Sequence, residues 1–389
     1  MRSRADRFAH VPVAPDVAPH PAHQRSRFSA AYRVLEEAIA AHAFPGCAFG
    51  VLVRGEIVLL DGLGRFTYND DAPAVTGQTI YDVASVTKVV ATTAVVMRLR
   101  QQGRLDVDTP LGELLPAFIQ GGDPAERRQQ VRLRHLLSHN SGLPGYVEFF
   151  RTAATPTALL RACMELPLEA EPGTRAEYSD PGFILLGKAL EVLADEKLAQ
   201  LVRKEVLHPL GLRSTSFCPQ RAVRPFIPPT EEDTTFRHRR IQGEVQDENA
   251  FVLKGAAGHA GLFSNVPDLL CFANAILHGA PGPVSPAEPE QMKSALFEPR
   301  IVDEFAQRQG PEGSSRALGW DTPSANSSAG RHFSPRAIGH LGYSGCSLWI
   351  DLDAAVAVVL LTNRTWPDRK SQLIREVRPL FHDAVREGL

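Results

Sequence analysis

Apolar positions change their period along the chain, and these changes predict the order of its elements. From residue 27 to about residue 42, apolar side chains recur every three or four positions, which is typical of an amphipathic helix. Residues 48–53 and 57–60 are rich in β-branched and aliphatic side chains, and the short turn between them contains Gly55. The N-terminal part therefore predicts one helix followed by a β-hairpin.

Helical patterns dominate the middle of the chain, and strand patterns return near its end. The predicted helices, separated by Gly and Pro loops, are residues 89–100, 157–165 and 183–193. Two apolar runs at residues 347–350 and 354–361 predict strands, and residues 368–386 predict a final amphipathic helix. This order favours an α+β fold, in which an antiparallel sheet flanked by N- and C-terminal helices carries a mostly helical inserted lobe.

The domain organisation follows from the same pattern. Residues 1–26 contain several prolines and no periodic apolar positions, so we expect a flexible tail. Residues 27–84 and 245–389 are predicted to form the sheet domain, and residues 85–244 the helical lobe. A length of 389 residues fits two such units better than one compact core.

Composition narrows the class of protein. A hydrophobic fraction of 43% and a net charge of -2 describe a globular protein, and with no basic patch nucleic acid is not an expected partner. The five cysteines are odd in number and widely spaced, which favours neither a disulfide framework nor a zinc site. No apolar run is long enough for a membrane span, and the N-terminus lacks a signal-peptide core. We expect a cytoplasmic protein, or a periplasmic one if the start of the chain is misassigned.

The candidate chemistry begins at S-V-T-K, residues 85–88. A loop from the sheet enters an apolar helical stretch there, so Ser85 and Lys88 are expected on one helix face. A serine hydroxyl becomes a nucleophile when a nearby base accepts its proton, and a helix N-terminus offers N–H groups to an oxyanion. The apolar neighbours predict a desolvated amine with a lowered pKa. An N-cap serine with a surface lysine is the alternative, because S-x-x-K arises about once by chance in such a chain.

A second candidate segment, residues 172–180, is a Pro-Gly turn that delivers Tyr178 and Asp180. Tyr178 is a candidate second proton carrier. To act as a base near neutral pH its pKa must fall from about 10 to about 7, which requires roughly 4 kcal/mol of stabilisation by neighbouring cations. A tyrosine packed in the core, with its hydroxyl bonded to a carbonyl, is the alternative.

The third segment is H-L-G-Y-S-G, residues 340–345, directly before a predicted strand. Its glycines allow a backbone to approach a ligand closely, as Gly342 would at a strand edge. His340 is a candidate for a hydrogen bond or a positive charge to a substrate, and the N–H of Tyr343 for part of an oxyanion hole, with Ser344 beside them. A buried histidine with satisfied nitrogens is the alternative. The α/β-hydrolase elbow G-x-S-x-G does not fit, because a cysteine stands at its last glycine.

These three segments, in this order, resemble the motifs S-x-x-K, Y-x-N and K-T-G or H-x-G of the serine β-lactamase superfamily. That superfamily includes class C β-lactamases, penicillin-binding proteins, D-alanyl-D-alanine carboxypeptidases and related esterases. The likeness runs from about residue 30 to the end of the chain. Four further segments are similar to the family and are expected to be structural: residues 136–143, 258–264, 318–320 and 360–364.

The resemblance implies roles for single residues. Ser85 would form the acyl-enzyme, Lys88 and Tyr178 would exchange protons, and the N–H groups of Ser85 and Tyr343 would hold the oxyanion. His340, at the Lys or His position of the third motif, would contact a substrate carboxylate or tune Tyr178. The other expected substrate contacts are Asp180, Gly342 and Ser344. The resemblance implies no metal and no cofactor.

One departure from the family is Asp180, which stands where the family often has Asn. An ionised Asp only accepts hydrogen bonds, so the amide donor to a substrate carbonyl is lost and a pair with Lys88 is gained. Its charge also opposes a tyrosinate at Tyr178. We expect a small-molecule ester, amide or β-lactam substrate. Asp180, together with the missing signal-peptide core, favours the ester or amide over penicillin-like substrates and places D-alanyl-D-alanine carboxypeptidase second. A catalytically inert ligand-binding homologue is the other alternative, and the sequence leaves the oligomeric state open.

Overall fold

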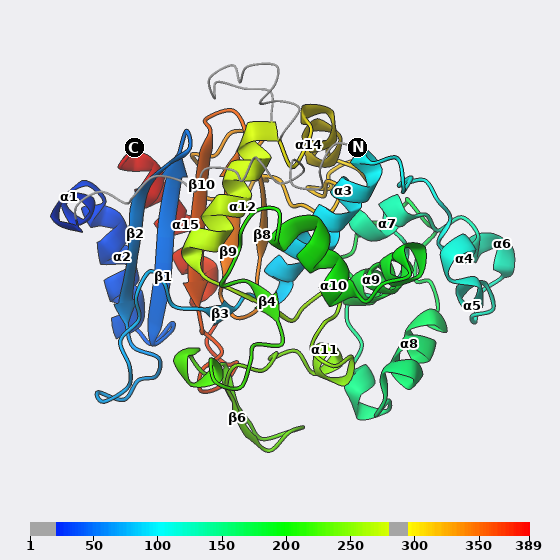
Figure 1. The fold of residues 1–389 in the computed structure, drawn as a ribbon, viewed down its shortest axis with the longest axis horizontal. Helices are drawn as coiled ribbons and strands as arrows, with labels where there is room; N and C mark the ends of the chain where they lie inside the picture. The colour runs from blue at the N-terminus through cyan, green and yellow to red at the C-terminus, as the bar shows by residue number, and fades with distance from the viewer. Residues whose placement is uncertain (1–20, 280–294) are drawn as a thin grey trace, which may run out of the picture.

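A five-stranded antiparallel sheet forms the centre of the fold. The computed structural model describes residues 21–279 and 295–389. The strands of this sheet stand in the order β2-β1-β10-β9-β8 (Figure 1). They are β1 (Gly46–Val53), β2 (Glu56–Gly64), β8 (Ile338–Leu341), β9 (Ser347–Asp351) and β10 (Val356–Thr362). The N-terminal hairpin therefore pairs with strands from the C-terminal part through the contact of β1 with β10.

The sheet is covered on both faces, and its central strand β10 is apolar from Val356 to Leu361. Along β10, Val358 and Leu360 pack on one side, and Val359 and Leu361 pack in the core on the opposite side. Successive side chains of a strand point to opposite faces, so one continuous apolar run can supply two cores.

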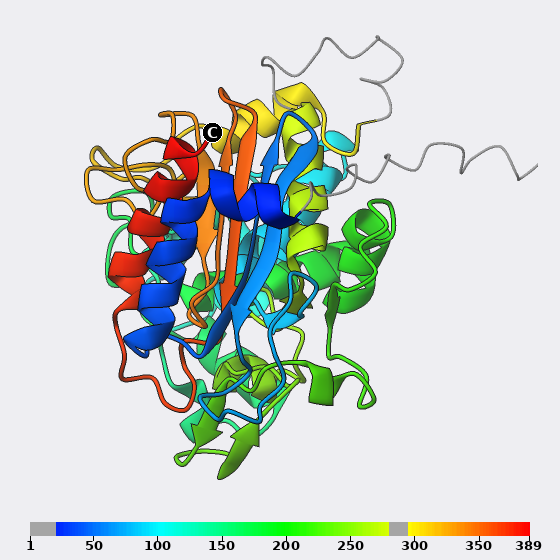
Figure 2. The same ribbon diagram turned by 90° about the vertical axis from the view of Figure 1, so that its left-hand side faces the viewer.

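The terminal helices cover one face of the sheet. Helix α2 (Ser29–Ala40) and helix α15 (Ile374–Glu387) lie side by side across it, as the blue and red helices of Figure 2 show. Helix α1 (Pro21–Arg27) precedes them, so the predicted flexible tail is wrong for residues 21–26. Proline is well tolerated in the first turn of a helix, where its missing N–H has no partner to lose. Residues 1–20, the rest of that predicted tail, lie outside the described residues.

The opposite face carries α12 (Val266–Gly279), which packs against β1 and β10. A Cβ on Gly50 would lie 2.5 Å from Cγ1 of Val266, so this glycine permits the close approach of helix and strand. Beyond α12 lies the helical lobe (Figure 1). Its α-helices are α3 (Ala94–Gln101), α4 (Leu111–Leu114), α5 (Pro116–Ile119), α6 (Ala125–Arg128), α7 (Leu133–Leu137), α8 (Pro156–Met164), α9 (Asp180–Ala194) and α10 (Leu198–Val202).

Smaller elements connect the sheet and the lobe. Three short strands form a second sheet in the order β3-β7-β4, and β5 pairs with β6. Their bounds are β3 (Tyr81–Asp82), β4 (Ser216–Phe217), β5 (Glu231–Asp233), β6 (Arg239–Ile241) and β7 (Leu262–Ser264). The remaining α-helices among the described residues are α11 (Glu248–Val252) and α14 (Pro299–Ala306), and short 3-10 or π turns span Ala84–Val86, Lys88–Thr93, Phe149–Arg151, Arg203–Leu207 and Arg224–Phe226.

The predicted fold class is confirmed: an antiparallel sheet, flanked by terminal helices, carries a mostly helical lobe. The predicted first helix, hairpin and two C-terminal strands form within a few residues of their expected bounds, and the last helix forms but begins at Ile374 instead of residue 368. The boundaries of the two domains, residues 27–84 with 245–389 and residues 85–244, stay a prediction. Within the described part of the chain, no helix has the length and apolar character needed to cross a membrane.

Candidate active site

Ser85 lies at a tight turn between the small sheet and the lobe. Strand β3 leads into the 3-10 turn Ala84–Val86, and a wide π turn, Lys88–Thr93, continues into α3. Ala84 has φ 46°, a left-handed conformation that is rare for a residue with a Cβ. The buried carboxylate of Asp82 holds this turn, because its oxygens accept from the N–H of Ala84 at 2.8 Å and from the N–H of Gln246 at 2.7 Å. Backbone strain of this kind is typical of functional sites.

Lys88 is fully buried beneath Ser85 and uses all three of its N–H donors. Its Nζ lies 3.0 Å from Oγ of Ser85, 2.7 Å from Oδ1 of Asp180 and 3.1 Å from the carbonyl oxygen of His259. Burial lowers the pKa of the Lys88 amine, but the charge of Asp180 and the neighbouring Tyr178 outweigh it, so the pKa is raised. The predicted lowering of this pKa is therefore wrong, because the apolar surroundings contain one carboxylate in direct contact with the amine.

Tyr178 lies over Lys88 at the start of α9. Nζ of Lys88 is 4.8 Å from the centre of the Tyr178 ring, and Ser179, the next residue, caps α9 by accepting from the N–H of Gly182. Burial raises the pKa of the Tyr178 phenol; Lys88 opposes this effect, and Asp180 adds to it. The expected opposition between Asp180 and a tyrosinate is thus confirmed in direction. The phenol is a neutral proton donor in the resting site.

His340 approaches the same tyrosine from the edge strand β8. The two ring centres lie 5.9 Å apart, and His340 is buried. Its Nδ1 lies 2.8 Å from the carbonyl oxygen of Leu341, which only accepts, so Nδ1 carries the proton. Nε2 is then an acceptor, and no described residue is its partner. Burial, with Lys88 and Arg316, holds the pKa of His340 well below its usual range. The predicted option of a positive charge at His340 is therefore wrong, and its neutral hydrogen-bonding capacity remains.

The residues after His340 pack and form a hydrogen bond against the turn before Ser85. A Cβ on Gly342 would lie 2.4 Å from the carbonyl oxygen of Val83, so only a glycine fits there. Ser344 is fully buried, and its hydroxyl donates to the carbonyl oxygen of Asp82 at 2.8 Å. Its side chain thus holds the fold together and does not face a ligand. Tyr343 is 49% exposed at the rim, and its carbonyl oxygen accepts from Nε of Arg364.

Two further residues lie against Tyr178 that sequence reasoning did not assign to the site. The ring of His139 is 4.6 Å from the Tyr178 ring, and Cζ of Arg316 lies 5.3 Å from the same ring centre. His139 belongs to the segment 136–143, whose likeness to the family could have drawn attention to it. Arg316 precedes the segment 318–320 but lies in no motif, so nothing in the sequence distinguished it from the other arginines.

His139 accepts hydrogen bonds from the backbone of both sequence neighbours of Tyr178. Its carbonyl oxygen accepts from the N–H of Glu177 at 2.7 Å, and its Nδ1 accepts from the N–H of Ser179 at 3.0 Å. The ring is buried between Tyr178 and Phe183, and its Nε2 has no partner among the described residues. Burial holds the pKa of His139 well below its usual range, so the ring is neutral.

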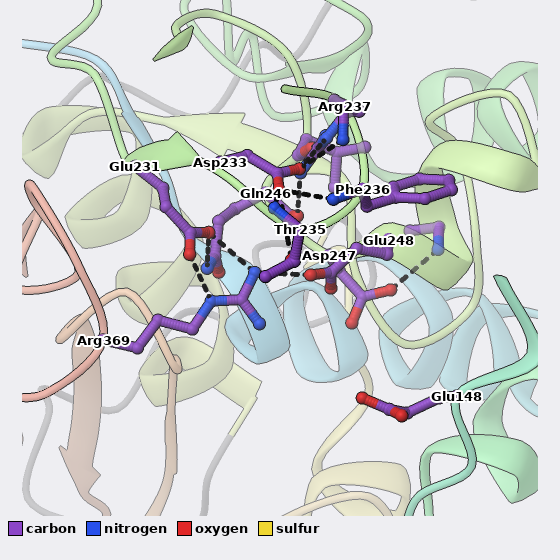
Figure 3. Close-up of polar contacts among 12 residues, drawn as sticks. Glu148, Glu231, Asp233, Thr235, Phe236, Arg237, Gln246, Asp247, Glu248 and Arg369 are labelled. Atoms are coloured by element: carbon purple, nitrogen blue, oxygen red, sulfur yellow. Dashed lines mark hydrogen bonds and ion pairs between the residues drawn. The ribbon is translucent and has the colours of Figure 1, made fainter. Parts of the chain in front are cut away.

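A charged network forms another part of the surroundings (Figure 3). Arg369 donates to both Glu231, at 2.6 Å, and Glu248, also at 2.6 Å. Asp247, next along the chain to Glu248, lies 2.9 Å from Nε2 of His259, whose carbonyl oxygen accepts from Lys88. Although burial raises the pKa of Asp247, the interaction with His259 and the N–H of Ala250 bring it down to about 2. This carboxylate is therefore ionised at neutral pH.

A cavity of about 470 Å³ is lined among others by Phe150, Phe236, Phe251 and Lys254. None of the predicted site residues lines it. The site is therefore defined by the side chains that converge on Ser85 and not by this hollow.

The fold and the site together define a protein of the penicillin-binding-protein and β-lactamase class, in which a Ser-x-x-Lys turn meets a tyrosine and the edge of an antiparallel sheet. Comparison with known proteins agrees. The family model described as Beta-lactamase matches residues 32–379. The chain belongs to this family.

Relatives within the family carry several activities in their names. The chain is 30% identical over 362 residues to an N-acetylmuramyl-L-alanine amidase of Bacillus subtilis, covering 85% of this chain and 80% of the relative. It is 29% identical over 316 residues to a putative D-alanyl-D-alanine carboxypeptidase of Salmonella typhimurium, covering 74% of this chain and 70% of the relative.

Solved structures share the fold at lower identity. EstCE1, a hydrolase with promiscuous acyltransferase activity, superposes with a TM-score of 0.71 at 22% identity, covering 92% of this chain and 100% of its own. A penicillin-binding protein homologue from Caulobacter crescentus gives a TM-score of 0.71 at 19% identity, covering 96% of this chain and 99% of its own.

Proposed function

We propose that this protein is a serine hydrolase that cleaves an ester or amide bond of a small molecule through an acyl-enzyme on Ser85. The observation that carries the proposal is the 3.0 Å contact between Nζ of Lys88 and Oγ of Ser85, beneath a nucleophile that is itself only half-buried. A buried lysine is costly unless it is paired, and here it is paired with Asp180 and directed at one hydroxyl. An inert binding protein has no need for that arrangement.

Acylation in this proposal starts when Lys88 has lost a proton. The neutral amine takes the proton from Oγ of Ser85 as Oγ attacks the substrate carbonyl, and the new bond is the ester of the acyl-enzyme. Because Asp180 raises the pKa of Lys88, the neutral amine is scarce at neutral pH and becomes more abundant as the pH rises toward that pKa. The N–H groups of Ser85 and Tyr343 would receive the oxyanion. The N–H of Tyr343 has no acceptor among the described residues.

Tyr178 would serve the leaving group. Its raised pKa keeps the phenol protonated, which suits a general acid that gives a proton to the departing oxygen or nitrogen. The protonated Lys88 then returns a proton to Tyr178, so the proton that left Ser85 ends on the leaving group. Water would hydrolyse the acyl-enzyme by the same steps in reverse.

The second candidate function is D-alanyl-D-alanine carboxypeptidase activity, which the Salmonella relative's name favours. Asp180 speaks against it, because a carboxylate bonded to Lys88 replaces a possible amide donor to a peptide carbonyl. The Bacillus relative, an amidase, keeps amide substrates in the first proposal.

The test compares the wild type with Ser85→Ala on p-nitrophenyl butyrate, nitrocefin and a D-Ala-D-Ala peptide. We expect turnover of the ester or the β-lactam, and a fall of roughly 10³-fold or more in Ser85→Ala. Labelling by a fluorophosphonate should add mass at Ser85 only. Ser324→Ala, at an exposed serine outside the site, is the matched control. Turnover or labelling that survives in Ser85→Ala overturns the proposal, and turnover of the peptide alone selects the second candidate.

A further inference from the structure

The cavity of about 470 Å³ is lined by none of the side chains that converge on Ser85, and four of its lining residues are phenylalanines. The ring of Phe236 lies edge to face against that of Phe150, with ring centres 4.9 Å apart, and against that of Phe251, at 6.0 Å. Small-molecule sites typically have volumes of this order and combine apolar walls with a few polar groups. The cavity therefore has the size and the walls of a site for an apolar ligand.

The charged residues of the cavity leave one cation over. The carboxylate of Glu244 accepts from Nη1 of Arg224 at 2.9 Å and from Nη2 of Arg239 at 2.6 Å. Lys254 is exposed at the cavity and has no ion-pair partner in the described part of the chain. With Arg224 and Lys254 as its cations and Glu244 as its carboxylate, the lining carries a surplus positive charge, which lies at Lys254.

The wall that carries Lys254 is fixed by its contacts with Cys218. Sγ of Cys218 donates to the carbonyl oxygen of Lys254 at 3.2 Å, and a Cβ on Gly255 would lie 2.7 Å from the same sulfur. Cys218 and Lys254 both have a left-handed backbone, with φ of 51° and 69°. Such conformations are costly for residues with a Cβ and persist where the surrounding structure determines them. The cavity is therefore preformed, and Cys218, the most exposed of the five cysteines, lines it.

We propose that this cavity is a second binding site, for a small molecule that joins an apolar body to one carboxylate. The body packs against the phenylalanine rings, and the carboxylate accepts a charge-assisted hydrogen bond from Nζ of Lys254. A neutral apolar ligand would leave the surplus charge unpaired, and a cationic one would be repelled by it. The inference goes beyond the proposed function and does not rest on it, because no group of the acylation chemistry takes part.

The first test uses the thiol of Cys218 as a reporter of occupancy. Its alkylation by iodoacetamide, an uncharged reagent, is timed by mass spectrometry in mildly alkaline buffer, because burial raises the pKa of this thiol. At about four times its Kd, 4-phenylbutyrate should slow the alkylation roughly fivefold. At the same concentration 4-phenylbutan-1-ol, which has the same apolar body and no charge, should slow it less. No slowing by the acid, or equal slowing by both compounds, overturns the inference. Ser85→Ala should show the same protection as the wild type, whether or not the proposed function holds.

The second test places the ligand by NMR titration of both compounds into folded variants. Ala154→Trp fills the cavity from an exposed lining position and should abolish binding, whereas Ala30→Trp, at an exposed position of α2, should keep it. Lys254→Gln should raise the Kd of 4-phenylbutyrate roughly 3- to 10-fold, the range of an exposed charge contact, and leave that of the alcohol unchanged. Lys197→Gln, at a lysine that is 78% exposed, changes the net charge equally and should keep the wild-type Kd. Binding that survives Ala154→Trp, or a Kd for the acid that Lys254→Gln leaves unchanged, overturns the inference.

Discussion

Buried histidines on the two sides of the central sheet differ in how their ring nitrogens are satisfied. Between α15 and β9, His382 is fully buried, and its Nδ1 lies 2.7 Å from the carbonyl oxygen of Ser328 and its Nε2 3.2 Å from Oγ of Ser347. In the candidate active site His139 and His340 are also buried, yet Nε2 of each has no partner among the described residues. Burial lowers the pKa of all three rings, so all three are neutral near pH 7.

The difference lies in hydrogen bonding: protein oxygens lie within hydrogen-bond distance of both ring nitrogens of His382 but not of Nε2 in His139 and His340. A buried nitrogen without a hydrogen bond costs free energy, and proteins rarely leave one in place without a reason. On the face of the sheet covered by α15 this cost is avoided, because two protein oxygens lie within hydrogen-bond distance of the two ring nitrogens of His382. Beside Tyr178, Nε2 of His139 and Nε2 of His340 have no such partner among the described residues.

The largest effect is expected from breaking the contacts of His139 with Tyr178. His139→Ala removes the acceptor for the N–H of Ser179 and the ring packed on Tyr178. We expect kcat to fall by roughly 10- to 100-fold, because a displacement of about 1 Å in a reacting group has effects of this size. Since Tyr178 is proposed to protonate the leaving group, the loss should be larger on phenyl acetate than on p-nitrophenyl acetate, whose leaving group needs less help.

His139→Asn is the matched variant for this prediction. Its amide oxygen can accept from the N–H of Ser179, and Asn tolerates the left-handed φ of 56° found at this position. It should recover much of the lost kcat. An equal loss on both esters, or a His139→Asn variant as slow as His139→Ala, would show that His139 acts on the fold in general and not through Tyr178.

Sequence patterns predicted the elements of the sheet side more fully than those of the site side. Amphipathic helices such as α2 and apolar strands such as β10 are long enough to show their period. Strands of two or three residues, such as β3 and β7, show none, although they place the turn before Ser85. The π turn that begins at Lys88 was equally invisible, because the apolar run only indicated a helix.

Within the site, the order of the three motifs predicted which residues meet, but not their charge states. Ser85, Lys88, Tyr178 and His340 do converge. The raised pKa of Lys88 depends on Asp180, which contacts it at 2.7 Å across 92 positions of the chain. The pair of Asp180 with Lys88 was predicted and is confirmed, but its effect on the pKa of Lys88 was not predicted. The contact between Arg316 and Tyr178 had no counterpart in the sequence pattern.

His382 should make the stability of the sheet side depend on pH. Burial, joined by the charge of Arg378, lowers the pKa of His382 from 6.5 to about 4. The folded state therefore resists a proton that the unfolded state accepts, so stability is fully present above pH 6.5 and is lost as the pH falls toward 4. Between pH 7.5 and pH 5 this single ring should cost about 2 kcal/mol.

The measurement for His382 is urea unfolding at both pH values for the wild type and His382→Gln, which can still bond to Ser328 and Ser347. The wild type should lose about 2 kcal/mol more than the variant over this interval. Equal losses in the two proteins would show that His382 does not resist protonation. The hydrogen bonds of both ring nitrogens of His382 would then not set its protonation apart from that of His139 and His340, whose Nε2 atoms have no partner among the described residues.

The smallest change in structure, Asp180→Asn, tests the electrostatics of the site itself. The variant keeps an oxygen that can accept from Nζ of Lys88 but removes the negative charge, and that charge raises the pKa of both Lys88 and Tyr178. Both pKa values should therefore fall, and the rise of kcat/KM with pH, which reports the loss of a proton from Lys88, should move to lower pH.

Glu191→Gln, on the same helix but paired with Lys188, removes an equal charge outside the site and should leave the profile in place. A profile that stays fixed or moves to higher pH in Asp180→Asn would mean that Lys88 is not the group whose deprotonation limits acylation. The contrast between the two sides of the sheet would then rest on hydrogen bonding alone.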